Sequence, residues 1–332
     1  MNMFLFKKMG FFVILLGVMA FSSYANEPGI VFDKELFRGW VVDFTEDARK
    51  EGISDTTIYK FMENAEFLPK VVELDRRQPD KTKTFNQYVR NLITDKKVDT
   101  AKQKYAENRK LLEEVAEKYN VQPRFIVALW AIESDFGRNM GGFNIVNSLT
   151  TLAYEGRRAE FFRKELINAL KIIDAGHVGF DNMKGSWAGA MGQTQFMPTS
   201  FLTLAVDYNE DGKTDIWQTK EDIFGSIANY LAQTGWDSNS TWGREVILPE
   251  NFDSSLIGKD VKKTLREWSE LGIRKVDGTL LPTVKDMEAS IIKPENEKGK
   301  AYIVYSNYMT ILKWNRSLYF ATTVGMFSDR IM

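Results

Sequence analysis

The feature that most constrains the fold is an apolar run that ends in a carboxylate. Every residue from Phe125 to Ile132 is apolar, and Glu133 follows at once. Pro123 fits the first position of a helix, and Gly137 fits the position just past its end. A helix that is apolar on all sides must be buried on most of them. We therefore expect this helix to be buried on most sides.

Glu133 has the surroundings of a general acid. Its helical neighbours, three and four residues back, are Trp130 and Leu129, and burial against them disfavours the charged carboxylate. The negative end of the helix dipole acts in the same direction. A carboxylic acid that is protonated near neutral pH is what protonation of an acetal oxygen requires. Asp135 is only two residues further on, so in a helix it would face elsewhere and form a poor glycosidase pair. The alternative is structural, in which Glu133 meets a lysine or caps a loop.

Composition excludes several other chemistries. The 332-residue chain has no cysteine and a single histidine, His177. Disulfides, thiolate nucleophiles, zinc–thiolate and iron–sulfur sites, cysteine-linked lipid anchors and multi-histidine metal sites are therefore excluded, and a Ser-His-Asp triad is disfavoured. With 45 acidic and 44 basic side chains, the charge gives no reason to expect a nucleic-acid partner. His177 matches no motif, and we expect it in a loop without a catalytic role.

The first 25 residues are expected to be a cleaved signal peptide. Lys7 and Lys8 precede an uncharged run over residues 9–21, and residues 23–25 have the small-x-small form of a cleavage site. The run is short for a membrane span, although an uncleaved anchor is the alternative. Cleavage would remove two lysines and no acids, which moves the formal net charge from −1 to −3. We expect a mature chain in the bacterial periplasm with no transmembrane segment, which is not a lipoprotein because it has no cysteine.

The remaining chain reads as mainly α, in an α+β class. Helical patterns over 26–118 predict an N-terminal helical domain, and the candidate site motifs follow within 119–245. Prolines, the turn signal Asp277-Gly278 and the strand-like segment 301–305 predict a small β-containing domain over 246–306. Helical character returns over 307–332, which we expect to pack back on the central part.

A glycine-rich stretch over 185–201 suits a saccharide. Its glycines allow close approach of the backbone, its neutral polar groups match sugar hydroxyls, and its aromatic rings match the C–H face of a sugar. The polar groups belong to Ser186, Gln193, Thr194 and Gln195, and the rings to Trp187 and Phe196. The spacing does not fit a phosphate loop. The alternative is a tightly packed turn with Met191 and Met197 in the core.

Residues 207–215 match the first nine positions of an EF-hand loop. Such a loop carries oxygens at positions one, three and five, glycine at six, a backbone carbonyl at seven and an acid at nine. These positions are occupied by Asp207, Asn209, Asp211, Gly212, Lys213 and Asp215. Gln218 replaces the usual glutamate at position twelve, so Glu221 or Asp222 would close the shell in a longer loop over 207–222. We expect structural Ca²⁺ and no organic cofactor, and the alternative is an Asx-rich turn.

Together these segments resemble the family of the membrane-bound lytic murein transglycosylase B, over nearly all of the mature chain. The motifs are LDRRQPD (74–80), ALWAIESDFG (128–137), LTTLAYEGRRAEFFRKEL (149–166), GSWAGAMGQTQFMPTS (185–200), DYNEDGKTDIW (207–217), SIANYLAQTGW (226–236) and WNRS (314–317). The resemblance implies a lysozyme-like catalytic core with a helical domain and a small inserted β domain. It also implies cleavage of the β-1,4 bond between N-acetylmuramic acid (MurNAc) and N-acetylglucosamine (GlcNAc) in peptidoglycan, which leaves a 1,6-anhydro end.

The resemblance further implies roles for individual residues. Glu133 would be the sole catalytic acid and then the base. The residues implied to line the sugar subsites are Ser186, Gln195, Phe196, Tyr230 and the C-terminal Asn315. Arg157 and Arg158 would face the acidic peptide stem, although adjacent arginines are more often solvated or ion-paired.

The chain departs from the family pattern at two positions near its C-terminus. Trp314 stands where tyrosine is usual, and Phe320 falls where a tyrosine hydroxyl is expected. The family's EF-hand loops take a late acidic ligand, which favours Asp222 or Glu221 over Gln218. The expected partner is a peptidoglycan glycan strand with its stem peptides. Two other functions stay open: a hydrolytic muramidase that uses a distant second carboxylate, and a non-catalytic peptidoglycan-binding scaffold.

Overall fold

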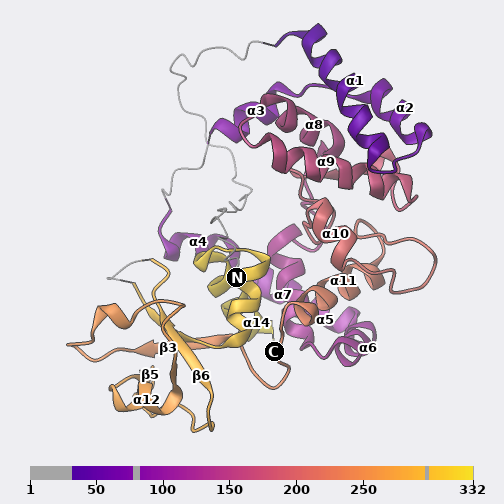
Figure 1. The fold of residues 1–332 in the computed structure, drawn as a ribbon. Helices are drawn as coiled ribbons and strands as arrows, with labels where there is room; N and C mark the ends of the chain where they lie inside the picture. The colour runs from indigo at the N-terminus through magenta and orange to yellow at the C-terminus, as the bar shows by residue number, and fades with distance from the viewer. Residues whose placement is uncertain (1–31, 78–82, 296–298, 332) are drawn as a thin grey trace, which may run out of the picture.

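The computed structural model describes residues 32–77, 83–295 and 299–331 (Figure 1). The expected signal peptide and the end of the motif at 74–80 lie outside the described residues. In chain order, the helices of the described ranges are α1 (Lys34–Lys50), α2 (Asp55–Asn64), α3 (Pro69–Arg76), α4 (Phe85–Leu92), α5 (Asp95–Glu107), α6 (Arg109–Tyr119), α7 (Pro123–Ser134), α8 (Ile145–Glu155), α9 (Ala159–Asp174), α10 (Pro198–Leu204), α11 (Lys220–Gln233), α12 (Leu265–Glu270), α13 (Ser306–Trp314) and α14 (Leu318–Ile331). The strands are β1 (Phe143–Asn144), β2 (Lys184–Gly185), β3 (Gly243–Ile247), β4 (Lys263–Thr264), β5 (Arg274–Lys275), β6 (Glu288–Ile292) and β7 (Ala301–Val304).

One group of helices combines α1, α2 and α3 from the start of the chain with α8 and α9 from its middle. Helices α1 and α3 pack on α8, and α2 packs on α9, at the top of Figure 1. Phe37, Val41, Phe44 and Ala48 are buried at helical spacing along α1, which turns this apolar stripe inward. Asp33 caps this helix by accepting hydrogen bonds from the amides of residues 35 and 36.

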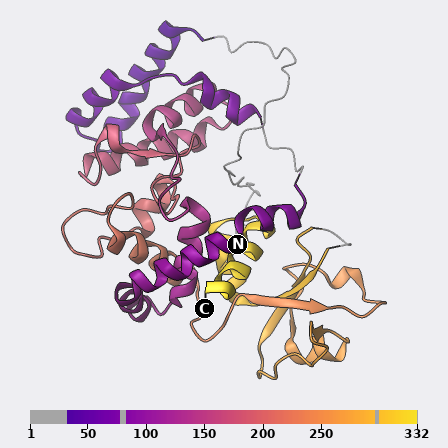
Figure 2. The same ribbon diagram turned by 180° about the vertical axis from the view of Figure 1, so that it is seen from behind.

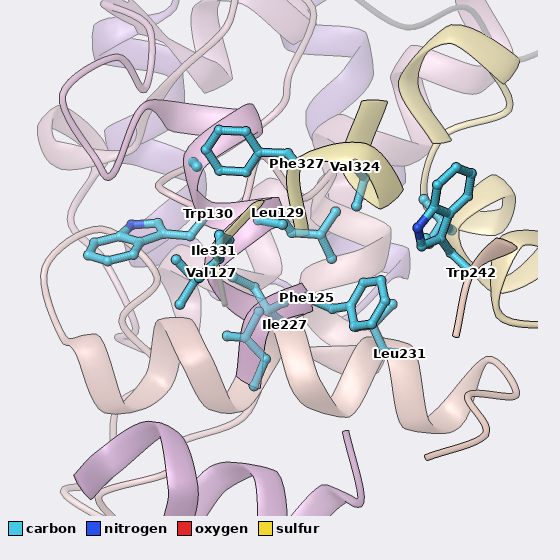
Figure 3. Close-up of a cluster of buried hydrophobic side chains, with 14 of the residues drawn as sticks. Phe125, Val127, Leu129, Trp130, Ile227, Leu231, Trp242, Val324, Phe327 and Ile331 are labelled. Atoms are coloured by element: carbon cyan, nitrogen blue, oxygen red, sulfur yellow. The ribbon is translucent and has the colours of Figure 1, made fainter. Parts of the chain in front are cut away.

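The second group surrounds α7. Helices α5, α6, α11 and α14 all contact it, and every residue over 125–131 is buried (Figure 3). This confirms the expectation that the apolar helix is buried on most sides. The helix ends at Ser134, before the expected boundary, because Asp135 and Phe136 already have left-handed backbone angles (φ 52° and 60°). Gly137 follows with φ 84°.

The small sheet lies beside the helices that surround α7 (Figures 1 and 2). Its five strands are antiparallel and run in the order β4-β6-β7-β3-β5. Alternate residues of its central strand β7 enter two different cores. Tyr302 and Val304 pack into the cluster around α7, whereas Ala301 and Ile303 pack with Trp268 of α12. The strand predicted within 301–305 is therefore present, and the mainly α class with a small sheet-bearing insertion is confirmed.

Two large clusters of buried residues divide the helices. The α1–α3 segment belongs to one cluster with α8 and α9, and the α4–α6 segment belongs to the other with α7, α11 and α14. The expected N-terminal helical domain over 26–118 contains both segments, and the domain boundaries stay a prediction. Within the described ranges, no helix combines the length and the apolar character needed to cross a bilayer.

Candidate active site

Glu133 lies in the last turn of α7 and is half-buried. The indole Nε1–H of Trp314 donates a hydrogen bond of 2.7 Å to its Oε1. Burial raises the pKa of Glu133 to about 8, while this hydrogen bond acts in the opposite direction. Trp130 and Leu129, the neighbours one turn back, are buried. The direction of the shift is the one expected from the sequence, and it leaves the carboxyl mostly protonated at neutral pH.

Three aromatic side chains gather beside this carboxyl: Phe196, Tyr230 and Trp314, here called the aromatic trio. The ring centroid of Trp314 lies 4.6 Å from that of Tyr230 and 5.1 Å from that of Phe196. Burial, followed by the charge of Glu133, raises the pKa of Tyr230 to about 12. Trp314 packs against both large core clusters, so the trio stands where the two helix groups meet.

Two neighbours of Glu133 were not found from the sequence. Trp314 belongs to the motif WNRS and departs from the family pattern, but nothing in the sequence places it at Glu133, and no motif contains Tyr88 of α4. Tyr88 is buried, and its pKa is raised by burial and then by the charge of Glu133. Both residues reach Glu133 only through tertiary packing, so no local spacing could have indicated them.

The glycine-rich stretch is built as a tightly packed turn. The Ser186 hydroxyl accepts a hydrogen bond from the Ala190 amide (3.0 Å), and the Gln195 side chain donates to the carbonyls of Gly192 (2.8 Å) and Met140 (3.0 Å). Met191 is fully buried, as the packed-turn alternative requires, whereas Met197, which that alternative also places in the core, is only partly buried. Phe196 is the member of the predicted sugar-lining set that this turn brings into the trio.

Gln193 fastens this turn to α7. Its Oε1 accepts from Trp130 Nε1 (2.6 Å), and its Nε2 donates to the carbonyl of Trp217 (2.7 Å). A Cβ on Gly137 would lie 2.5 Å from the same Oε1, so glycine is needed there for space as well as for its φ angle. The turn, the end of α7 and the acidic loop are thus held together beside Glu133.

Arg157 and Arg158 lie at the contact between α3 and the α8–α9 connection. Both guanidinium groups reach the buried carboxylate of Asp75, at 2.7 Å each. Burial alone would raise the pKa of Asp75, but the two arginines hold it below its usual value. The side chains of Arg157 and Arg158 remain 40% and 38% exposed, so each has surface left for a further partner. Their implied role at the peptide stem stays a prediction.

Asn315 closes α13. It is buried, and its Oδ1 accepts a hydrogen bond of 3.0 Å from the amide of Ser317 at the turn into α14. Phe320 is buried in the core around α7. The turn made by Asn315 follows directly after Trp314 and fixes where the indole can lie.

The acidic loop over 207–222 uses its side-chain oxygens on its own backbone. Asp207 accepts from the Gly212 amide (2.7 Å), and Asp211 accepts from the Lys213 amide (2.9 Å). Asp222 is fully buried and accepts from the amides of residues 208 (2.8 Å) and 215 (2.7 Å). Asp215 caps the following turn at residues 217 and 218, and Asn209 contacts Asp211.

These oxygens are of the kind that Ca²⁺ prefers. In the described part of the chain, however, no three acidic or histidine side chains converge closely enough to hold a metal ion. Of the two candidates to close the shell, Asp222 is the one that reaches the loop backbone. Burial raises the pKa of this carboxyl, and the amide hydrogen bonds oppose the rise.

His177 follows α9 in a loop, as expected. Its Nδ1 accepts a hydrogen bond of 3.0 Å from the amide of Thr214, and its ring lies beside Phe201. It therefore supports the acidic loop and is not among the groups that contact Glu133.

A mainly helical body with a partly buried glutamic acid beside aromatic rings defines a lysozyme-like class of protein. Residues 36–329 match the family described as the transglycosylase SLT domain, and the chain belongs to that family.

The chain is similar to several characterised proteins. It is 31% identical, over 217 residues, to membrane-bound lytic murein transglycosylase B of Escherichia coli K12, and the match covers 64% of this chain and 58% of that protein. The crystal structure of SltB3 from Pseudomonas aeruginosa with NAG-anhNAM-pentapeptide superposes with a TM-score of 0.87 at 40% identity, covering 89% of this chain and 79% of that one. E. coli SLT35 in complex with calcium gives a TM-score of 0.75 at 26% identity, covering 88% and 92%.

Proposed function

We propose that this protein is a lytic transglycosylase that cleaves the β-1,4 bond between MurNAc and GlcNAc in peptidoglycan. Support comes from its family and from the relative SltB3, which was solved with both NAG-NAM-pentapeptide and NAG-anhNAM-pentapeptide. The observation that carries the proposal is the state of Glu133, which burial keeps protonated near neutral pH beside three aromatic rings.

The proposed reaction uses one carboxyl group twice. Glu133 first gives its proton to the glycosidic oxygen, and the bond from that oxygen to C1 of MurNAc breaks. The resulting carboxylate then takes the proton of the C6 hydroxyl as the C6 oxygen bonds to C1. The product carries a 1,6-anhydro ring, no water is consumed, and Glu133 ends protonated again.

The surroundings of Glu133 favour this route over hydrolysis by a carboxylate pair. Among the described residues, burial and the hydrogen bond from Trp314 are the causes of its pKa shift, and no charged side chain contributes. Asp135, the next acid along the chain, lies past the end of α7 and pairs with Arg138 (2.9 Å) and Lys97 (3.5 Å). A glycosidase pair would place a second free carboxylate across the bond.

The proposed subsites follow from the same region. The half-buried rings of Tyr230 and Trp314 would stack on sugar rings, while Phe196, which is 3% exposed, would meet a sugar only at the edge of its ring. Ser186, Gln195 and Asn315 would line the sugar subsites as positioned turns. Arg157 and Arg158 would use their exposed faces on the acidic stem peptide. A periplasmic location after cleavage of residues 1–25, and the domain boundaries given above, belong to the same proposal.

The first experiment identifies the product. The mature protein is incubated with purified peptidoglycan sacculi, and the soluble fragments are analysed by mass spectrometry. We expect 1,6-anhydro-MurNAc ends, each lighter by one water than a reducing end. Reducing ends would identify a hydrolase, and no release of fragments by the folded protein would favour the scaffold.

We also propose that the loop over 207–222 binds a structural Ca²⁺ through its side-chain oxygens and the Lys213 carbonyl, with Asp222 as the late acidic residue. Support comes from the all-oxygen donor set and from the relative SLT35, solved in complex with calcium. Binding would exchange amide hydrogen bonds of the loop for contacts with the ion.

Calcium that binds only the folded state should raise Tm, by the equivalent of about 2.7 kcal/mol at a hundred times its Kd. We expect Asp211→Ala to abolish this rise. Lys213→Ala is the matched control, because it removes a side chain but keeps the backbone carbonyl. A Tm that is the same with calcium and with chelator would identify a plain Asx-rich turn.

A further inference from the structure

We infer that Trp314 is a positioning residue that reserves Oε2 of Glu133 for proton transfer by occupying Oε1 permanently. This inference rests on the proposed function for its chemistry, although its geometric part can be tested without any substrate.

The argument begins with the donor. The indole nitrogen of Trp314 lies 2.7 Å from Oε1 of Glu133. An indole N–H can only donate, so the oxygen that it contacts must accept in both ionisation states of the carboxyl. A proton on Oε1 would face the indole hydrogen of Trp314, and the hydrogen bond could not form. The neutral acid therefore carries its proton on Oε2, to which no residue of the described ranges donates a hydrogen bond.

The second step concerns how firmly the indole is held. Trp314 is the last residue of α13, and the buried Asn315 turns the chain directly after it. Its ring is tilted against Tyr230 and Phe196. It also packs against both core clusters, so a rotation of the side chain would disturb contacts with both helix groups.

The chemical consequence differs between the two halves of the reaction. When Oε2 gives up its proton, negative charge spreads to Oε1, where the indole N–H already points, and the hydrogen bond becomes charge-assisted. The same oxygen, Oε2, then recovers a proton from the C6 hydroxyl. Because Oε1 is always engaged, the carboxyl does not need to turn over between the two steps.

The direct test observes the hydrogen bond itself. The signal of the Trp314 indole is identified in ¹H–¹⁵N spectra of the mature protein as the one lost in Trp314→Phe. We expect it to shift with pH around a midpoint of about 8, and to stay constant over the same range in Glu133→Gln. An indole signal that does not respond to pH, or that responds equally in Glu133→Gln, would overturn the inference.

The kinetic test uses Trp314→Phe, which keeps an aromatic ring but loses the donor. Loss of a hydrogen bond to a charged group should lower kcat about tenfold. The alkaline limb of the pH–activity profile should move up by about one pH unit, because the carboxylate loses a stabilising donor. Trp236→Phe is the matched control, since its indole donates to Gln122 instead and should leave the limb in place. An unmoved limb in Trp314→Phe would also overturn the inference.

These outcomes are separate from those that concern the proposed function. Reducing-end products, or full activity of Glu133→Gln, would overturn the proposed reaction whatever the indole does. An indole that fails to sense Glu133, in an enzyme that still forms anhydro ends, would overturn only the role of Trp314.

Discussion

Glu133 at the end of α7 and Glu165 in α9 are two glutamates whose pKa values are raised, in both cases first by burial. Their hydrogen-bond partners differ. Glu165 is 3% exposed and uses both oxygens, which accept from the amide (2.9 Å) and the hydroxyl (2.8 Å) of Thr199. Glu133 accepts one hydrogen bond, on Oε1, and remains partly accessible.

In the proposed reaction, this difference separates a structural carboxyl group, that of Glu165, from the one that reacts, that of Glu133. Glu165 accepts hydrogen bonds from Thr199 at the start of α10 and thereby links that short helix to α9. Both of its oxygens are therefore used in the folded structure. Glu133 accepts from one donor, Trp314, and in the proposed reaction its other oxygen serves the substrate. Burial alone does not make a carboxyl group reactive, because the group must also keep an atom without a hydrogen-bond partner that a substrate can reach.

The largest expected effect is a difference in activity between Glu133→Gln and Glu165→Gln. Glu133→Gln should lower the release of fragments from sacculi by about a thousandfold, because an amide cannot transfer the proton. Glu165→Gln should keep most of the activity, since its amide can still accept from the Thr199 amide and donate to the Thr199 hydroxyl. Equal losses in the two variants would break the distinction between them.

The next effect is on stability. Glu165→Ala leaves two donors of Thr199 without their acceptor and removes buried volume, so the free energy of unfolding should fall by roughly 2–3 kcal/mol. Urea denaturation measures this loss, and Glu165→Gln should lose less than half as much. A fully stable Glu165→Ala would show that the contact between α9 and α10 does not depend on this carboxyl.

The pH dependence of the free energy of unfolding tests the raised pKa of Glu133. In the folded state its pKa is about 8 against an ordinary value of 4.5, so the folded protein holds a proton that the unfolded chain releases. The free energy of unfolding should therefore fall as pH rises from about 5 to 8, by on the order of 2 kcal/mol after allowance for partial exposure.

Glu133→Gln has no such proton to release. Its melting temperature should equal that of the wild type near pH 5 and exceed it near pH 8. A constant difference between the two proteins across this range would contradict the raised pKa, because only a group that titrates differently in the two states produces a slope.

The smallest expected effect comes from Asp75, a buried carboxyl whose pKa the arginines lower. Asp75→Asn should cost about 1 kcal/mol at pH 7, a modest figure because Arg157 and Arg158 are well exposed to solvent. The cost should begin to shrink as pH falls below about 4, where the carboxyl is protonated in the unfolded chain, and should disappear as pH falls through the lower pKa of the folded state. Thermal melts of both proteins at pH 7 and pH 3 measure it.

The sequence predicted what depends on local causes. The burial of α7 follows from its continuous apolar run, and the direction of the Glu133 pKa follows from neighbours one turn back. The segment 301–304 has the strand composition that its two-sided burial requires. These features were accessible because residues three or four apart in a helix, or two apart in a strand, must share a face.

What could not be predicted depends on contacts between distant segments. The indole that binds Glu133 lies 181 residues away in the chain, and Asp75 meets Arg157 across 82 residues. The pattern around Arg157 and Arg158 did not indicate that both would meet a buried acid of α3. Residues 26–118 read as one helical domain, yet their helices enter two different cores.

The central claim is that Glu133 stays protonated at neutral pH, and its own titration tests this most directly. The protein is labelled with ¹³C at the glutamate side-chain carboxyl carbon, and the signal absent from Glu133→Gln is followed from pH 3 to pH 10. We expect a midpoint near 8. A midpoint near 4.5, the ordinary value for glutamate, would mean that the carboxyl is ionised at neutral pH and would contradict the account.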